Sequence, residues 1–178
     1  LRNHGRKRPK GLSVITGQTA FLDWRDWYDQ RYFGFMMQMG DIPAALGRVQ
    51  LRLLDGFLQR RRKAAAYYNQ VFADAGIPID LPVPRSRVNS SFLHYVVRSP
   101  KRAEIAAFLA DRGIETGVHY PAPLHFLQPA RELLGDLTGR FPVAEKWAQE
   151  ILSLPVGPHL SDTQVEHVAE AVQAFFRA

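Results

Sequence analysis

One amphipathic pattern, running from residue 41 to residue 75, constrains the fold more than any other feature of the sequence. Apolar side chains recur there every three or four positions, the spacing of one face of an α-helix: Ile42, Leu46, Val49, Leu53, Phe57, Ala64, Tyr68, Val71 and Ala75. Asp41 suits the N-cap, Pro43 is tolerated in the first turn, and Gly76 suits the C-terminal stop. At about 1.5 Å per residue such a helix is roughly 50 Å long, more than the width of a small domain. We therefore expect it to bend or to bridge two domains.

The residues after this helix predict a compact α/β unit. Local composition and periodicity predict strands at 91–98, 114–120 and 152–156, and helices at 99–113, at 142–151 and from 161 onward. The last helix opens with a capping box of Ser161 and Gln164. Its inward face is expected to carry Val165, Val168, Ala169, Val172, Phe175 and Phe176. Residues 1–40 are rich in aromatic side chains but lack periodicity, so we expect irregular structure packed against something larger.

Composition narrows the class of protein. The 178 residues are 46% hydrophobic, which suits a soluble globular chain and excludes disordered and collagen-like structure. No apolar run approaches the roughly 20 residues of a membrane span. The absence of cysteine excludes disulfides, thiolate metal ligands and a cysteine nucleophile, and it fits a cytoplasmic protein. Because the sequence opens at Leu1 without an initiator methionine or a capped element, we expect it to begin within a longer protein.

Positive charge is concentrated in two clusters. With 23 Lys and Arg against 17 Asp and Glu, the net charge is +6. The basic residues gather in the first ten positions and in the run Arg60 to Lys63. Such clusters favour contact with nucleic acid, an anionic surface or a phosphorylated small molecule. No nucleic-acid-binding motif accompanies them, and consecutive helical positions cannot form one stripe. A solvated face, or a loop that faces a phosphorylated small molecule, is therefore favoured over nucleic acid.

A strand running into a proline-rich loop carries the densest set of functional side chains, Thr-Gly-Val-His-Tyr-Pro-Ala-Pro-Leu-His at 116–125. The loop holds His119, Tyr120 and His125, at a kind of junction that often positions site residues. A partly exposed turn without function stays an equal alternative. The six-residue spacing of the two histidines, with no carboxylate nearby in sequence, argues against a metal site. His94, in the predicted strand, suits a packed or hydrogen-bonded histidine better than a ligand. The sequence also lacks the strong local motifs for nucleotide binding, acyl transfer and zinc hydrolysis.

Several segments, in order along nearly the whole chain, together resemble one protein family. They are Leu-Arg-Asn-His-Gly at 1–5, Gly-Phe-Met-Met-Gln-Met-Gly-Asp-Ile-Pro-Ala-Ala-Leu-Gly at 34–47, residues 54–68 with their Arg-Arg-Arg-Lys, Gly-Ile-Glu-Thr-Gly-Val-His-Tyr-Pro-Ala-Pro-Leu-His at 113–125, and Leu-Ser-Leu-Pro-Val at 152–156. This order resembles the second half of the DegT/DnrJ/EryC1/StrS sugar aminotransferases. Members of that family are pyridoxal-phosphate (PLP) enzymes of the aspartate-aminotransferase fold, also called fold type I. They usually transfer an amino group from glutamate to a nucleotide-linked keto-sugar.

The resemblance implies an organisation in three parts. Residues 1–40 would end a large cofactor domain, residues 41–76 would form the long bridging helix, and residues 77–178 would form the small C-terminal α/β domain. The Schiff-base lysine would lie upstream of Leu1, so no catalytic residue is assigned within this chain. The resemblance also implies PLP as cofactor, a nucleotide-sugar and an amino-acid donor as substrates, and a homodimer.

The resemblance further suggests which residues meet the substrates. His119, Tyr120 and His125 match the family segment that lines the sugar side of the cleft. In the loop after Gly34, which in the family reaches a neighbouring subunit's active site, the usual polar pair is replaced by Met36 and Gln38. Gln38 is therefore the candidate cofactor contact, because an amide can hydrogen-bond where a thioether cannot supply a charge. Since the lysine is not in this chain and Met36 departs from the family, a non-catalytic binding or regulatory relative is the alternative.

Overall fold

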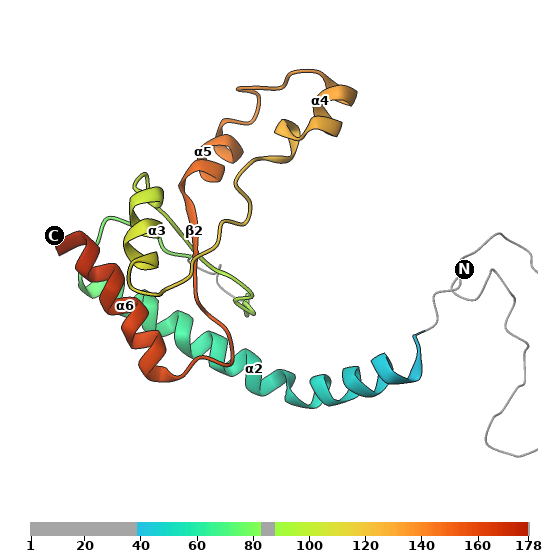
Figure 1. Cartoon of the computed structure of the whole chain (residues 1–178), viewed down its shortest axis with the longest axis vertical. Helices are drawn as coiled ribbons and strands as arrows, with labels where there is room; N and C mark the ends of the chain where they lie inside the picture. Colours follow the sequence, from blue (N-terminus) through green and yellow to red (C-terminus); the bar gives the residue numbers. More distant parts are fainter. Residues whose placement is uncertain (1–38, 83–87, 178) are drawn as a thin grey trace, which may run out of the picture. The chain divides into compact units, whose positions relative to one another are not determined.

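The computed structural model describes residues 39–82 and 88–177 (Figure 1). Its elements, in chain order, are α2 (Asp41–Asp74), β1 (Tyr95–Arg98), α3 (Arg102–Ala110), the 3-10 helix η1 (Leu124–Phe126), α4 (Gln128–Leu134), α5 (Pro142–Glu150), β2 (Ile151–Leu154) and α6 (Asp162–Arg177). The chain divides into two compact units between Arg52 and Leu53, within α2, and the core and the sheet described below lie in the second unit. Within the described ranges, no helix combines the length and apolarity that crossing a bilayer requires.

The long helix predicted from the apolar stripe is present as α2, and Gly76 follows it with a φ of 59°. Its two halves differ. In the first half the stripe is exposed: Ile42, Leu46 and Val49 are 78%, 63% and 51% accessible. In the second half α2 buries Ala64, Ala65, Tyr68 and Phe72. Ala75, predicted to continue the stripe, is exposed because the helix has already ended at Asp74, and Phe72 takes the last buried position instead.

The core of the second unit forms where α2, β1, β2, α3 and α6 meet. Its largest fully buried side chains are Tyr68, Tyr95, Phe72, Ile105, Leu109, Leu152, Val97 and Val172. Tyr68 stacks on Phe72 with parallel rings 5.6 Å apart and packs obliquely on Tyr95 at 5.0 Å. Both phenols are satisfied, since Tyr68 donates to the carbonyl of Pro155 (2.9 Å) and Tyr95 donates to Oδ1 of Asn69 (2.7 Å). Burial of these rings fixes α2 against the sheet.

The sheet is smaller than the sequence predicts. β1 and β2 pair antiparallel, with Tyr95 opposite Leu154 and Arg98 opposite Ile151. The strand predicted at 91–98 begins only at Tyr95, because the backbone turns at Phe92, whose φ is 44°. The strand predicted at 114–120 is wrong: only Gly117 pairs, forming an isolated bridge with Ser153. The chain then leaves the sheet toward the prolines at 121 and 123, which cannot donate to a ladder. The strand predicted at 152–156 lies at 151–154.

The helices follow the prediction more closely. The stretch predicted at 99–113 is helical only from Arg102 to Ala110, because Ser99 Oγ accepts the amide of Lys101 in the turn that precedes α3. The α5 helix is confirmed at 142–150. The capping box of α6 is confirmed: the amide of Ser161 donates to Oε1 of Gln164 (2.9 Å), and the amide of Gln164 donates to Oγ of Ser161 (3.2 Å). The inward residues expected of α6 are buried up to Val172, and the two phenylalanines are partly buried.

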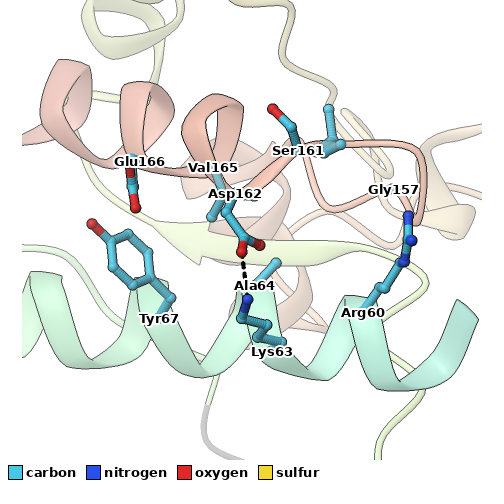
Figure 2. A pocket seen from close by; sticks show the side chains of 10 residues that line it. Arg60, Lys63, Ala64, Tyr67, Gly157, Ser161, Asp162, Val165 and Glu166 are labelled. Carbon is cyan, nitrogen blue, oxygen red and sulfur yellow. Dashed lines mark hydrogen bonds and ion pairs between the residues drawn. The ribbon is translucent and has the colours of Figure 1, made fainter. Parts of the chain in front are cut away.

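The basic run in α2 is held by the chain's own carbonyl and carboxylate oxygens. Three arginines donate to carbonyls: Arg60 to Pro158, Arg61 to Phe92 and Leu93, and Arg62 to Ser90. Lys63 pairs with Asp162 in the first turn of α6, as Figure 2 shows. This ion pair lines the hollow between α2 and α6 in that view, together with Tyr67 and Glu166. The run therefore connects loops and helices of the second unit rather than forming one basic face.

The two buried tyrosines predict a loss of stability in alkali. Burial raises the pKa of Tyr68 and of Tyr95 well above the ordinary 10.0, and the nearby Tyr68 adds to the shift at Tyr95. Above pH 10 the unfolded chain releases these protons and the folded chain keeps them, so the stability present below pH 10 falls as pH rises. The expected slope is about 1.4 kcal/mol per pH unit for each phenol. Urea unfolding between pH 8 and pH 11 measures it.

A pair of tyrosine variants isolates this effect. Tyr95→Phe removes one titrating phenol and is expected to flatten the slope, whereas Tyr120→Phe alters a side chain that is 73% exposed and is expected to keep it. Equal slopes in the two variants would contradict the assignment.

Candidate functional site

A large apolar cleft lies beside the segment that carries the predicted site residues. Its volume is about 1030 Å³. Its walls come from the 119–125 segment, α4, α5 and the start of β2, and include Val96, His119, Tyr120, Pro121, Ala122, Pro123, Leu124, His125, Leu127, Ala130, Leu134, Leu137, Phe141, Ala144, Trp147, Ala148 and Ile151. The structure therefore places all three candidate substrate residues on one wall. Mostly apolar walls with a few polar groups are typical of small-molecule sites.

The His119 ring lies against the isolated bridge that joins its segment to β2. Gly117 and Ser153 exchange two backbone hydrogen bonds, of 3.1 and 2.7 Å. From the same position in β2, Oγ of Ser153 lies 2.9 Å from Nδ1 of His119. The ring sits so close to Gly117 that a Cβ there would be 2.6 Å from its Cε1 atom. The position of the His119 imidazole is therefore defined by the Gly117–Ser153 bridge, by the Ser153 hydroxyl and by the lack of a side chain at Gly117.

Two further aromatic side chains surround His119. His94 stacks on it, with ring centroids 4.1 Å apart and planes 20° from parallel. Tyr120 meets it edge to face at 5.8 Å, and the peptide bond between His119 and Tyr120 is cis. His94 is exposed rather than enclosed in the core, because β1 starts one residue after it. A second, smaller hollow of about 380 Å³ lies along His94, Gly117 and Ser153, so His119 separates it from the larger cleft.

His125 has a carboxylate partner that its neighbours in sequence do not provide. Its Nε2 lies 3.0 Å from Oε1 of Glu145, and both side chains are largely buried. The same carboxylate accepts the amides of Gly139 and Phe141. Glu145 thus joins the start of α5 to the loop before it and to η1. Of the two candidate histidines, His125 has its Nε2 atom engaged, whereas His119 is engaged at Nδ1.

The two hollows beside His119 have no lysine among the described residues that line them. Lys63 and Lys146 are paired with Asp162 and Glu150. A lysine to link PLP is therefore not identified in the part of the chain that the structure describes. Gln38, the predicted cofactor contact, lies outside the described residues, as does Met36. Within 39–82 and 88–177 there is also no group of three side chains suited to a metal ion.

Sequence reasoning missed two residues of this site, Ser153 and Glu145. It interpreted His94 as a packed or hydrogen-bonded histidine, and the structure shows its ring stacked on His119. A signal existed for Ser153, because it is the single hydroxyl in the apolar run 151–156 and is only 6% exposed. A buried polar side chain in such a strand needs a partner. Nothing local indicates that Glu145 meets a histidine 20 residues earlier, or that His94 meets His119.

Comparison with known proteins places the chain in a family. The profile of the DegT/DnrJ/EryC1/StrS aminotransferase family matches residues 1–173. The chain belongs to this family, and the resemblance predicted from the sequence is confirmed. It is 37% identical over 173 residues to the dTDP-3-amino-3,4,6-trideoxy-alpha-D-glucose transaminase of Streptomyces venezuelae, covering 92% of this chain and 45% of that protein. It is also 39% identical over 153 residues to the Pleiotropic regulatory protein of Geobacillus stearothermophilus, covering 84% of this chain and 40% of that protein.

Solved structures agree on the fold. The crystal structure of S. venezuelae DesV in complex with a ketimine intermediate superposes with a TM-score of 0.79 at 34% identity, covering 85% of this chain and 40% of DesV. The predicted fold class, part of a PLP aminotransferase with a small sheet packed by helices, is thereby confirmed. The chain spans less than half the length of these relatives.

Proposed function

We propose that this chain is the substrate-side part of a PLP-dependent aminotransferase that moves an amino group from an amino acid, glutamate, to a nucleotide-linked keto-sugar. The observation that carries the proposal is the family match over residues 1–173, joined with a cleft whose wall holds His119 and Tyr120. The S. venezuelae relative is named for a dTDP-linked amino-sugar, which supports this substrate class.

We also propose the three-part organisation expected from the resemblance. Residues 1–40 end the large cofactor domain, and residues 77–178 form the small domain. Residues 41–76 form the long helix that bridges the two domains. The exposed stripe of Ile42, Leu46 and Val49 supports this division, because contiguous exposed apolar surface marks an interface. The cofactor domain is the proposed cover for it, and a homodimer in the cytoplasm is the proposed assembly, with Gln38 facing the cofactor.

In the proposed reaction the described residues bind and orient the sugar. His119 and Tyr120 offer an imidazole and a phenol at the cleft wall, suited to hydroxyl and keto oxygens. Phe141 and Trp147, half exposed on the opposite elements, offer apolar surface to the flat face of a sugar or base. His125 is the third proposed substrate residue, held by Glu145. PLP, bound by the rest of the enzyme, supplies the electron sink that makes amino transfer possible.

A specific observation favours a second candidate, a non-catalytic binding or regulatory relative. One relative is named a pleiotropic regulatory protein, and no PLP-linking lysine is identified among the described residues. Such a protein would keep the small domain and its cleft without amino transfer.

Cofactor binding separates the two candidates. The full protein is purified, and its absorption spectrum is recorded with added PLP, before and after glutamate. The enzyme is expected to show a visible band of lysine-linked cofactor that glutamate removes, and borohydride reduction followed by peptide mass spectrometry should identify the lysine. A spectrum equal to that of free PLP, with no modified peptide, would favour the non-catalytic relative.

A further inference from the structure

We propose that Ser153 is a positioning residue for His119: its hydroxyl holds Nδ1 of the imidazole and so leaves Nε2 to the sugar substrate. The inference rests on the proposed function, since it assigns a role within the same cleft. Its starting point is the 2.9 Å contact between Oγ of Ser153 and Nδ1 of His119. That is the one hydrogen bond of this ring among the residues that the structure describes.

The position of Ser153 is fixed by backbone pairing on both sides, independently of its side chain. Ser153 is the third residue of β2, pairs with Val96 across the sheet, and on its other side exchanges two hydrogen bonds with Gly117. It is 6% exposed. A residue paired on both sides has little freedom, so its hydroxyl is presented to the ring from a rigid element, which is how precise sites are supported.

Gly117 makes the approach of the ring possible. A Cβ at this position would lie 2.6 Å from Cε1 of His119, closer than such atoms approach in proteins, and 3.3 Å from Nδ1, which is a tight contact. The glycine is needed here for space, because its φ is not in the left-handed region where glycine is favoured. Ser153 and Gly117, which pair through one β-bridge, thus together position the His119 imidazole.

The chemical consequence concerns the second ring nitrogen. A hydroxyl can donate to an imidazole nitrogen or accept from it, so the Ser153 contact engages Nδ1 and orients the ring in either tautomer, and it leaves Nε2 to the substrate. A ring held in one orientation loses less freedom when substrate binds, which favours affinity. His94, stacked at 4.1 Å, restricts the ring further without occupying a nitrogen. Loss of the Ser153 hydroxyl should therefore weaken sugar binding while the fold stays intact.

The test compares Ser153→Ala with Ser153→Thr in the full protein, which restores a hydroxyl on a residue type suited to strands. Ser99→Ala is the matched control, since Ser99 is also a buried serine, 2% exposed, and its hydroxyl accepts the Lys101 amide, away from His119. Gly117→Ala disturbs the same ring from the backbone side. Histidine ring nitrogens are followed by 15N NMR, with the His119 signals assigned from their loss in His119→Ala. Steady-state kinetics give KM for the keto-sugar and for glutamate.

In Ser153→Ala the His119 nitrogen signals are expected to shift because Nδ1 loses its hydrogen-bond partner, and in Gly117→Ala they are expected to shift because the added Cβ displaces the ring. For Ser153→Ala the KM for the keto-sugar is expected to rise about threefold to tenfold, the usual effect of one hydrogen bond, with the KM for glutamate unchanged. Ser153→Thr should restore both readouts, and Ser99→Ala should alter neither.

Three results would overturn the proposal. Unmoved His119 signals in Ser153→Ala would refute the contact, and moved signals with an unchanged sugar KM would refute its role in binding; both leave the proposed function standing. Absence of sugar turnover by the wild-type protein would instead remove the proposed function, and this role with it.

Discussion

Replacing Phe72 with alanine is expected to lower the free energy of unfolding of the second compact unit, which begins at Leu53, by about 3 to 5 kcal/mol. Phe72 is 1% exposed and stacks in parallel on Tyr68, so its removal leaves a cavity in the cluster that fixes α2 to the sheet. Native-state amide exchange measures the change locally. The amides of Tyr95 and Val97 in β1 should exchange faster by the factor that corresponds to this energy.

The matched control is Leu133→Ala, which removes a large apolar side chain that is 82% exposed on α4. It is expected to change stability by less than about 0.5 kcal/mol. Slow exchange retained in β1 of Phe72→Ala would mean that α2 is not part of the domain core.

Replacing His119 with alanine in the full protein is expected to lower kcat/KM for the keto-sugar about 10- to 100-fold. The variant removes the imidazole at the cleft wall and leaves the Ser153 hydroxyl without its partner. The reaction with glutamate, measured separately as the loss of PLP absorbance on mixing, is expected to stay within about threefold of wild type. Stopped-flow traces of the two half-reactions provide the comparison.

His167→Ala is a suitable control, because His167 is an exposed histidine on α6 that lines neither hollow beside His119. It is expected to match wild type in both half-reactions. An equal loss in the glutamate reaction of His119→Ala would place this ring beside the cofactor rather than on the sugar side.

The helices could be predicted from sequence because their signals are local. The stripe of α2 and the capping box of α6 each depend on residues within a few positions of one another, and both were predicted correctly. The strand predicted at 114–120 was wrong because pairing depends on a distant partner. Only Gly117 finds one, at Ser153, before the prolines turn the chain away. The helix α4 and the 3-10 helix η1 were not predicted, because neither buries a residue and so neither has an apolar face that the sequence could show.

In the candidate site, too, local features could be predicted from the sequence and long-range contacts could not. His119, Tyr120 and His125 could be predicted because they stand together in one segment. Their partners could not: Ser153 is 34 residues from His119, and Glu145 is 20 residues from His125. A sequence pattern shows which side chains a segment carries, whereas packing decides which nitrogen of each ring is engaged.

The most direct test of the central claim is transfer of labelled nitrogen. The full protein with PLP is incubated with 15N-glutamate and a panel of nucleotide-linked keto-sugars that differ in the position of the ketone, and the products are weighed by mass spectrometry. The account predicts one nucleotide amino-sugar that carries the label, at a rate lowered by His119→Ala. Bound PLP with no label in any sugar would contradict the assignment of the cleft to a keto-sugar.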